Sequence, residues 1–398
     1  MKMLTLDKVF NAQTVLKNII RETNVVRAYG IAPECELYLK PENLQITGSF
    51  KVRGSAYKIA MLSEEEKAKG VVACSAGNHA QGVALAATKN GIKSLICLPD
   101  TAPISKVEAT KGFGAEVCLV EGCYDDAYKK ALELRDSEGY TFVHPFDDEN
   151  VIAGQGTIAL EILNDLDNID AIVVPIGGGG LISGIAYTAK QIRPSVKVYG
   201  VQVAGAPSMY NSVKDGEIEC LSSVSTIADG IAVKQPGENT FRYVSDYVDE
   251  IALVTDDEVA SAILALIEKQ KMIAEGAGAT AVAAVMANKF NLKGKRVVAV
   301  VSGGNIDVTS LSRVIDRGLL NSGRSSSLLI ELIDKPGQLK EISRIIADCG
   351  GNVTGVHYEK GNTESVNGCF LRIEMETRDF PHVNLITKTL RDEGFKLV

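Results

Sequence analysis

Four consecutive glycines are the residues whose types and spacing most directly suggest chemistry: Gly177, Gly178, Gly179 and Gly180. They follow an apolar run at 171–176 and precede a helical pattern that begins at Leu181. Backbone amides without side chains at a helix N-terminus form a cradle for an anion such as a phosphate. A flexible turn is the alternative, but a connection between a buried strand and a helix has to be rigid. The pattern therefore predicts that the amides from Gly177 to Leu181 bind a phosphate group.

The surrounding sequence limits which phosphate compounds could bind at the four glycines. A dinucleotide site needs G-x-G-x-x-G spacing, but counting from Gly178 places Ser183 at the third glycine position. The next strand, which ends at Val203, offers no acidic residue for a ribose hydroxyl, and no G-x-x-x-x-G-K-[ST] segment is present. Nicotinamide cofactors and P-loop nucleotides are therefore disfavoured.

Two other glycine-bearing turns follow short apolar runs. SAGNHAQG (75–82) comes after 71–74, and SGGN (302–305) comes after 297–301. Alone, each turn is more typical of a helix N-cap than of a binding site. At the carboxyl ends of strands in one sheet, however, the polar side chains of Asn78 and Ser302 can converge on one ligand.

Lys51 is the remaining candidate, in the stretch TGSFKVRG (47–54). It stands between an aromatic and an aliphatic residue, so its amine can be partly desolvated. Desolvation lowers the pKa of a lysine and makes the neutral amine available for Schiff-base chemistry. From the residues alone, a solvated surface lysine is the commoner situation.

The elements that must position these residues alternate between short β-branched runs and helical patterns up to about residue 318. We expect strands at 71–74, 93–98, 115–120, 171–176, 196–203 and 297–301, with an extended segment at 141–145. We expect helices at 80–89, 104–112, 124–137, 181–192, 255–273 and 279–289. Thr255 and Glu258 have the spacing of a capping box. This alternation predicts an α/β protein with open parallel sheets covered by helices.

The pattern changes after residue 320. Residues 320–327 (LNSGRSSS) have the composition of a linker. Beyond them we expect strands at 328–333, 352–358, 369–374 and 395–398, with helices at 339–349 and 382–392 and a polar turn that includes 360–364. This βαββαβ order is the ferredoxin-like motif.

Composition excludes several classes of protein. The chain has 398 residues, 45% hydrophobic and 23% charged, which is typical of a soluble globular protein of two or three domains rather than a disordered or fibrous one. A net charge of −8 disfavours a nucleic-acid-binding face, and no apolar run is long enough for a membrane span. We see no secretory signal at residues 1–10. The eight scattered cysteines include no CxxC pair, which favours reduced thiols in the cytoplasm over a metal site.

Four segments together carry a resemblance to a known family. LKPENLQITGSFKVRGS (39–55), SAGNHAQG (75–82), GGGGL (177–181) and SGGN (302–305) resemble, in order and separation, the motif blocks of fold-type II pyridoxal-phosphate enzymes. The most similar family is threonine dehydratase (threonine ammonia-lyase). The tail, with DKPGQL (334–339) and GNV (351–353), is similar to an ACT regulatory domain.

The resemblance implies a domain organisation. Residues 1–319 would form a catalytic domain like that of tryptophan synthase β, with two open-sheet subdomains and the smaller one inserted at about 48–148. Residues 320–327 would be the linker, and 328–398 the ACT domain.

The resemblance also implies roles for individual residues. Lys51 would hold pyridoxal 5'-phosphate covalently, and Phe50 would pack near the cofactor ring. Asn78 would bind the ring hydroxyl, and Ser302 would face the pyridine nitrogen. The amides from Gly177 to Leu181 would bind the phosphate.

Substrate binding and reaction are implied in the same way. Ser75, Ala76 and Gly77 would receive the substrate carboxylate. The implied reaction is elimination of water from L-threonine to give 2-oxobutanoate and ammonia, with Lys51 as general base, and L-serine would give pyruvate. Serine racemisation or β-replacement on the same scaffold is the alternative. A sensor protein with an inactive catalytic domain is disfavoured because Lys51 and the glycine loop are intact.

Regulation and assembly follow from the ACT resemblance. Asp334, Gly337 and Asn352 lie where ACT domains bind amino-acid effectors, with isoleucine as inhibitor and valine as its antagonist the obvious pair; plain turn chemistry and an unresponsive catabolic enzyme stay open. A homo-oligomer, either dimer or tetramer, is expected. Relatives can bind a structural cation, for which Asp229 and Glu275 are candidates beside an ordinary capping role.

Overall fold

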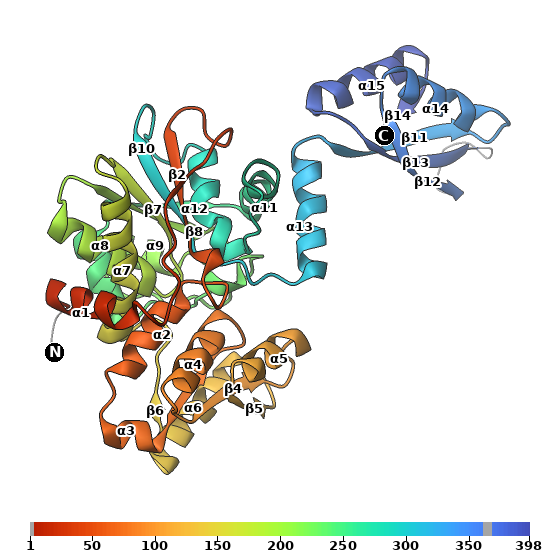
Figure 1. Cartoon of the computed structure of the whole chain (residues 1–398). Helices are drawn as coiled ribbons and strands as arrows, with labels where there is room; N and C mark the ends of the chain where they lie inside the picture. Colours follow the sequence, from red (N-terminus) through yellow and green to blue (C-terminus); the bar gives the residue numbers. More distant parts are fainter. Residues whose placement is uncertain (1–3, 361–367) are drawn as a thin grey trace. The chain divides into compact units, whose positions relative to one another are not determined.

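The structure is a computed structural model that describes residues 4–360 and 368–398. It divides into two compact units, Met1–Leu311 (unit 1) and Ser312–Val398 (unit 2). Figure 1 shows the elements of both units. The helix that joins them, α13 (Val308–Asn321), begins in unit 1 and ends in unit 2.

The larger sheet of unit 1 has six strands in the order β1-β2-β10-β7-β8-β9. All neighbours pair in parallel except β1 and β2, which are antiparallel. The strands are β1 (Val26–Arg27), β2 (Glu36–Pro41), β7 (Ala171–Pro175), β8 (Lys197–Val203), β9 (Glu250–Val254) and β10 (Arg296–Val301). The central strands β7 and β10 are buried almost along their whole length, as parallel strands covered on both faces should be.

The smaller sheet of unit 1 has four parallel strands in the order β5-β4-β3-β6. They are β3 (Val71–Cys74), β4 (Ser94–Pro99), β5 (Glu116–Val120) and β6 (Thr141–Phe142). The expected extended segment at 141–145 is a strand only over its first two residues. The segment after β6 turns instead toward Lys51, whose Nζ donates a hydrogen bond to the carbonyl oxygen of Pro145.

Helices connect the strands of both sheets (Figure 1). They are α1 (Leu6–Leu16), η1 (Glu42–Leu44), α2 (Lys51–Ala60), α3 (Glu64–Lys69), α4 (Asn78–Lys89), α5 (Ile104–Gly112), α6 (Tyr124–Glu138), α7 (Glu149–Asp165), α8 (Gly180–Ile192), α9 (Ser208–Asp215), η2 (Asp229–Ile231), α10 (Glu238–Tyr247), α11 (Asp256–Ala265), η3 (Leu266–Gln270) and α12 (Gly276–Met286). The alternation of strands and helices predicted from the sequence is confirmed.

One predicted helix is wrong in its extent. The expected helix 255–273 starts with the predicted capping box of Thr255 and Glu258, but regular α-helix stops at Ala265. A π-helical turn, η3, follows, and its C-cap is Lys271, whose φ of 58° is left-handed. This irregular exit ends the helix and redirects the chain toward Glu275, the N-cap of α12, which therefore starts three residues earlier than predicted.

Unit 2 is a four-stranded antiparallel sheet in the order β12-β13-β11-β14 with two helices. Its elements are β11 (Ser325–Ile333), α14 (Gln338–Asp348), β12 (Asn352–Lys360), β13 (Gly368–Glu376), α15 (Phe380–Asp392) and β14 (Lys396–Leu397). The predicted βαββαβ order is confirmed; most of the predicted polar turn, 361–364, lies outside the described residues. Of the expected linker 320–327, the first two residues belong to α13 and the last three to β11.

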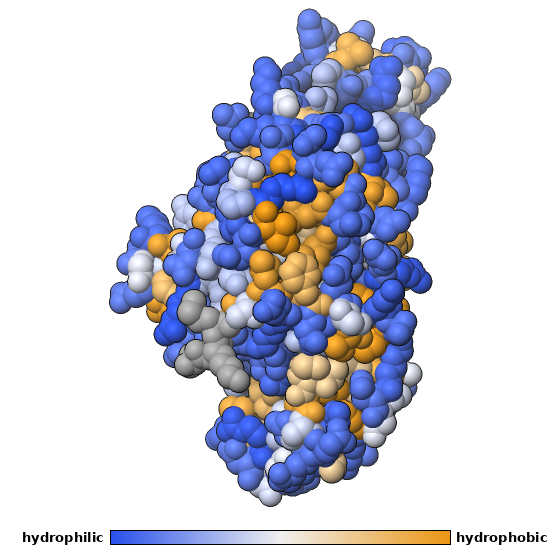
Figure 2. Space-filling view, turned by 60° about the vertical axis from the view of Figure 1, so that its left-hand side comes forward, coloured by the Kyte–Doolittle hydropathy of each residue, from blue (hydrophilic) through white to orange (hydrophobic). Residues whose placement is uncertain are grey.

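The surface is largely hydrophilic with apolar patches, as Figure 2 shows for one face. Among the described residues, the most exposed large apolar side chains include Val308 at 82%, Ile104 at 81% and Tyr29 at 69%. No helix within 4–360 or 368–398 is long and apolar enough to cross a membrane.

Helices α2 and α7 cross in backbone contact. A Cβ atom added at Gly154 on α7 would lie 2.6 Å from the carbonyl oxygen of Arg53 and 2.7 Å from the Cα of Gly54. One added at Gly54 would lie 2.8 Å from the carbonyl oxygen of Val151. Because Lys51 is the first residue of α2, this crossing fixes the helix that carries it.

Gly154→Ala should therefore destabilise unit 1, because backbone atoms cannot move aside for the new methyl group. We expect a loss of about 1–3 kcal/mol in the free energy of unfolding, measured by circular dichroism in urea. The control is Gly112→Ala in α5, whose added Cβ would meet no atom within 4 Å. Equal stability of the two variants would contradict the assigned crossing.

Candidate active site

Lys51 lies at the start of α2, directly after Phe50. Its Nζ donates a hydrogen bond to the carbonyl oxygen of Pro145 at 2.8 Å and lies 5.3 Å from the centre of the Phe50 ring. The residue keeps some exposed surface, but burial of the amino group lowers its pKa from 10.5 to about 8, against an opposing influence of the Glu275 charge. The structure thus gives Lys51 the properties of a nucleophile and base near neutral pH.

The loop after β10 docks onto the segment before Lys51. The amide of Phe50 donates to the carbonyl oxygen of Ser302 at 3.1 Å, and the amide of Gly304 donates to that of Gly48 at 2.9 Å. Ser49 and Gly303 form an isolated antiparallel bridge between these hydrogen bonds. Ser302 is only 2% exposed, and its hydroxyl makes one long hydrogen bond of 3.4 Å to the carbonyl oxygen of Ala277.

Asn78, the first residue of α4, is held by two side chains from distant parts of the sequence. Its Nδ2 donates to Oε1 of Glu275 at 2.7 Å, and its Oδ1 accepts from Nδ2 of Asn305 at 2.7 Å. Asn305 Nδ2 also lies 2.7 Å from the carbonyl oxygen of Thr47. These contacts fix the orientation of the Asn78 amide and join the three motif loops.

Glu275 has a role that the sequence did not indicate. Its side chain is buried, and burial raises its pKa to about 7, with the charge of Asp229 acting in the same direction and the Asn78 hydrogen bond opposing. Asp229 is exposed and pairs with Lys106 at 2.9 Å. Within the part of the chain that the structure describes, no group of three or more His, Cys, Asp or Glu residues could hold a metal ion. The structure therefore gives Glu275 an interaction with Asn78.

The glycine loop occupies the turn between β7 and α8, as predicted. An added Cβ at Gly178 would lie 2.4 Å from Cδ1 of Phe146, and one at Gly180 would lie 2.8 Å from its carbonyl oxygen. Gly179 has a φ of 96°, which a side chain would strain. Side chains at Gly178 and Gly180 would therefore collide with Phe146. The residue before Phe146 is Pro145, which accepts the Lys51 hydrogen bond.

The amides of this loop fit an anion. For residues 177–181, no hydrogen bond from a backbone N–H to a carbonyl or side chain of the described chain is found, although Ile176 immediately before them donates to Val201. Uncommitted amides at the start of a helix are donors for a phosphate. The hydroxyl of Ser49 is likewise buried without a hydrogen-bond partner in the described residues. Together with the Lys51 amine, these donors fit pyridoxal phosphate.

The segment after β3 is open toward solvent. Ser75 Oγ accepts a hydrogen bond from the amide of Gly77 at 3.1 Å, and Ser75, Ala76 and Gly77 are all partly exposed. A Cβ built on Gly77 would meet no atom within 4 Å. This space next to Asn78 can admit a ligand.

Two histidines near Lys51 are structural. His79 is 3% exposed; its Nε2 contacts the carbonyl oxygen of Val143 at 2.8 Å, and burial lowers its pKa to about 3. The prediction that His79 is a packed residue at a helix start is confirmed. His144 Nδ1 accepts the amides of Phe146 and Asp147, and burial lowers its pKa to about 4. Neither imidazole is charged near neutral pH.

The structure does not bring the three proposed effector residues together within unit 2: Asp334 and Gly337 follow the carboxyl end of β11, where Ile333 pairs with Gly368, whereas Asn352 begins β12 at the opposite end of the sheet, where it pairs with Glu376. Hydrogen bonding to Asp334 raises the pKa of Tyr358. Gly337 is the N-cap of α14 with a φ of 96°, and an added Cβ there would meet open space. Asn352 Nδ2 donates to Glu376 Oε2 at 2.9 Å. All three residues are exposed.

Comparison with known proteins gives one family. Residues 16–303 match the family model described as pyridoxal-phosphate dependent enzyme. The chain is 48% identical to the L-threonine ammonia-lyase of Thermotoga maritima over 398 residues, with 99% of both chains covered. It resembles the processed form of threonine deaminase isoform 2 from Solanum lycopersicum (37% identity, TM-score 0.75, 79% of this chain and 94% of that chain). It also resembles the serine racemase of Dictyostelium discoideum (38% identity, TM-score 0.72, 77% and 99%).

The lowered pKa of Lys51 predicts a specific pH dependence of its reactivity. Only the neutral amine reacts with an acylating reagent, so labelling of Lys51 in the cofactor-free full chain should rise with a midpoint near pH 8. Glu275→Gln removes the charge that raises the Lys51 pKa, so it should move this midpoint to lower pH. Mass spectrometry of the labelled peptides measures both, with the 84% exposed side chain of Lys293 as reference. A Lys51 midpoint near 10.4, the value for a free lysine, would contradict the assignment.

Proposed function

Because the chain belongs to the family of pyridoxal-phosphate dependent enzymes, we propose that it converts L-threonine to 2-oxobutanoate and ammonia. L-serine would give pyruvate by the same elimination of water. The observation that carries the proposal is the Lys51 amine, which burial favours in its neutral form where the motif loops meet. Similarity to an L-threonine ammonia-lyase along the whole chain supports the substrate.

The residues predicted from the sequence would hold the cofactor. Lys51 attaches it through Nζ, and Phe50 packs beside its ring. The amides of Gly177 to Leu181 bind its phosphate, supported by their lack of other acceptors in the described chain. Asn78 donates to the ring hydroxyl, supported by the hydrogen bonds that orient its amide. Ser302 presents a hydroxyl to the ring nitrogen.

The protein groups divide the remaining work. When bound, pyridoxal phosphate supplies the electron sink for the α-carbon of the amino acid. Ser75, with the amides of Ala76 and Gly77, orients the substrate carboxylate in the open space beside Asn78. Lys51, as a neutral amine, takes the α-proton at its Nζ. The β-hydroxyl leaves as water, and hydrolysis of the resulting enamine consumes one water, so the net products are 2-oxobutanoate and ammonia.

Serine racemisation is the second candidate, and similarity to a serine racemase of 38% identity favours keeping it. The two reactions share removal of the α-proton and differ in whether the β-hydroxyl is lost. β-Replacement differs again, since it would give a thioether product from a thiol.

The products distinguish these activities. Incubation of the full chain and pyridoxal phosphate with L-threonine should produce 2-oxobutanoate and ammonia in equal amounts, and L-serine should produce pyruvate. Lys51→Ala should lower the rate by at least about 1000-fold because the attached amine and the base are lost together. D-serine as the main product from L-serine would instead support a racemase.

Unit 2 would regulate this activity as an ACT domain. Asp334, Gly337 and Asn352 would bind the effector between paired unit 2 domains, with isoleucine as inhibitor and valine opposing it. Residues 1–319 remain the proposed catalytic domain, with 328–398 as the regulatory one. A dimer or tetramer and a cytoplasmic location complete the proposal.

Isoleucine should lower the rate with threonine, and valine should restore it. Asp334→Asn should weaken this response at least about tenfold while leaving the rate without effector unchanged, because the residue belongs to unit 2 and the proposed catalytic groups belong to unit 1. Glu393→Gln, an exposed acid-to-amide change in the same unit, is the control. Steady-state rates with increasing effector concentration measure the response. An enzyme indifferent to every branched-chain amino acid would contradict the regulatory assignment.

A further inference from the structure

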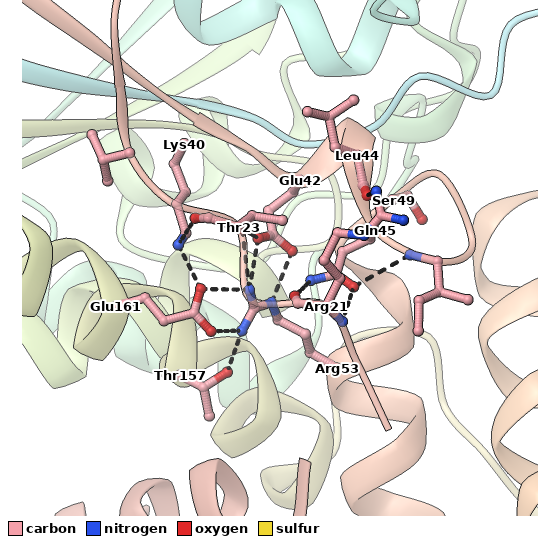
Figure 3. Close-up of polar contacts among 12 residues, drawn as sticks. Arg21, Thr23, Lys40, Glu42, Leu44, Gln45, Ser49, Arg53, Thr157 and Glu161 are labelled. Carbon is pink, nitrogen blue, oxygen red and sulfur yellow. Dashed lines mark hydrogen bonds and ion pairs between the residues drawn. The ribbon is translucent and has the colours of Figure 1, made fainter. Parts of the chain in front are cut away.

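Four charged side chains form a cluster inside unit 1, which we call the buried quartet: Lys40, Glu42, Arg53 and Glu161 (Figure 3). Their side chains are 0%, 0%, 0% and 8% exposed. They come from the end of β2, from η1, from α2 and from α7. No step of the proposed reaction uses any of them.

Arg53 is the centre of the quartet. Its Nε and Nη2 donate to the two oxygens of Glu42, both at 2.8 Å. Its Nη1 and Nη2 donate to the two oxygens of Glu161 at 2.5 and 2.8 Å. Nη1 also lies 3.1 Å from Oγ1 of Thr157. The planar guanidinium therefore makes two bidentate pairs at once, an arrangement that a lysine cannot make.

Every charge of the quartet is paired with a charge of opposite sign. Lys40 pairs with Oε2 of Glu161 at 2.5 Å and donates to the carbonyl oxygen of Thr23, whose hydroxyl donates to Glu42. Two positive and two negative charges sum to zero. Opposing carboxylates raise the pKa of Arg53 despite its burial. Because every charge has a partner of opposite sign, removal of one member leaves another buried without its counter-charge.

The quartet closes the loop that presents the reactive lysine. Glu42 and Arg53 flank residues 43–52, and their bidentate pair joins the two ends of this segment. Lys51 is two residues from Arg53 on the first turn of α2. At the far side of the loop, Ser49 and Phe50 are held by the strand-end residues Gly303 and Ser302.

The second carboxylate ties this loop to α7. Gly154, Thr157 and Glu161 have the i, i+3 and i+7 spacing of one helix face, which meets α2 at Gly54 and Arg53. The N-cap of α7 is Asp148, three residues after Pro145, which accepts the Lys51 hydrogen bond. Helix α7 therefore links Glu161, which binds Arg53, to the segment of Pro145, which accepts the hydrogen bond of Lys51.

We propose that the buried quartet is a positioning device for the catalytic lysine. It holds the loop 43–52 closed and fixed to α7, so that Lys51 Nζ stays at the Pro145 carbonyl and out of water. The proposal rests on the assignment of Lys51 as the cofactor-bearing residue, and it makes Arg53, Glu42, Glu161 and Lys40 positioning residues rather than catalytic ones.

The ionisation of Lys51 can report its position. The charged or titratable groups that influence its amine come from three elements: Glu275 at the start of α12, His79 on α4 and His144 in the segment after β6. The quartet contributes no net charge. A change that loosens the loop while keeping the charge balanced should therefore act on Lys51 through exposure of its amine.

The test variant is the double substitution Lys40→Met, Glu161→Gln. It removes one charge of each sign and leaves the Arg53–Glu42 pair, so no buried charge is stranded. In the cofactor-free full chain, the pH midpoint of Lys51 labelling should rise by about 1 unit, because the loosened loop exposes the amine to water. In the holoenzyme, kcat for threonine should fall at least about tenfold with a smaller change in KM, and the visible absorption of the bound cofactor should shift.

A second variant guards against failure to fold. Arg53→Lys keeps the charge but loses both bidentate pairs, and it should move the labelling midpoint in the same direction. Val198→Ala is the control, since it opens a cavity at the amino end of β8, away from the strand ends that carry the site. It should lower stability without moving the midpoint.

The outcomes separate this proposal from the proposed function. If threonine is not turned over but the midpoint shifts as expected, the function is wrong and the positioning role stands. If both quartet variants lose stability like Val198→Ala while the midpoint and the cofactor absorption stay unchanged, the quartet is purely structural and the proposal is overturned.

Discussion

The structure depends on burying a lysine amine so that its pKa falls toward neutral pH. Burying an ammonium group is costly unless a counter-charge accompanies it. The chain solves this problem in two ways within a few residues. Lys40 is paired with Glu161 and remains an ordinary member of a salt-bridge cluster. Lys51 donates to a carbonyl oxygen, that of Pro145, and burial of its amine lowers its pKa to about 8 despite the charge of Glu275, which makes the neutral amine needed for the proposed chemistry more accessible.

The rest of unit 1 holds the Lys51 amine in position relative to the other motif loops. The functional loops all lie at carboxyl ends of strands or at helix starts, where backbone groups are available to a ligand. Their relative positions are set by contacts between loops: Asn305 on Asn78 and Thr47, and Phe146 against the glycines. The glycine run is therefore needed twice, for uncommitted amides and for the close approach of the segment beyond β6.

The features that the sequence predicted correctly are those that local sequence patterns determine. Strand and helix order, the Thr255 capping box and the βαββαβ tail follow from periodicity and turn residues, and the family resemblance supplied the place of Lys51. The sequence could not predict contacts between residues that lie far apart along the chain. Glu275, Phe146 and the Glu42–Arg53 pair are single residues without a local signature, and each acquires its role from a partner far along the chain. The early end of α11 was also missed, because a π-helical turn and the left-handed Lys271 interrupt the helix where the helical pattern of the sequence continues.

The central claim is that Lys51, and no other lysine, holds the cofactor. The most direct measurement is borohydride reduction of the full chain with pyridoxal phosphate, followed by peptide mass spectrometry. A pyridoxyl group on the peptide that contains Lys51, absent from the Lys51→Ala protein, is the expected result. An unmodified Lys51 beside a pyridoxylated lysine elsewhere, such as Lys58, would contradict the account.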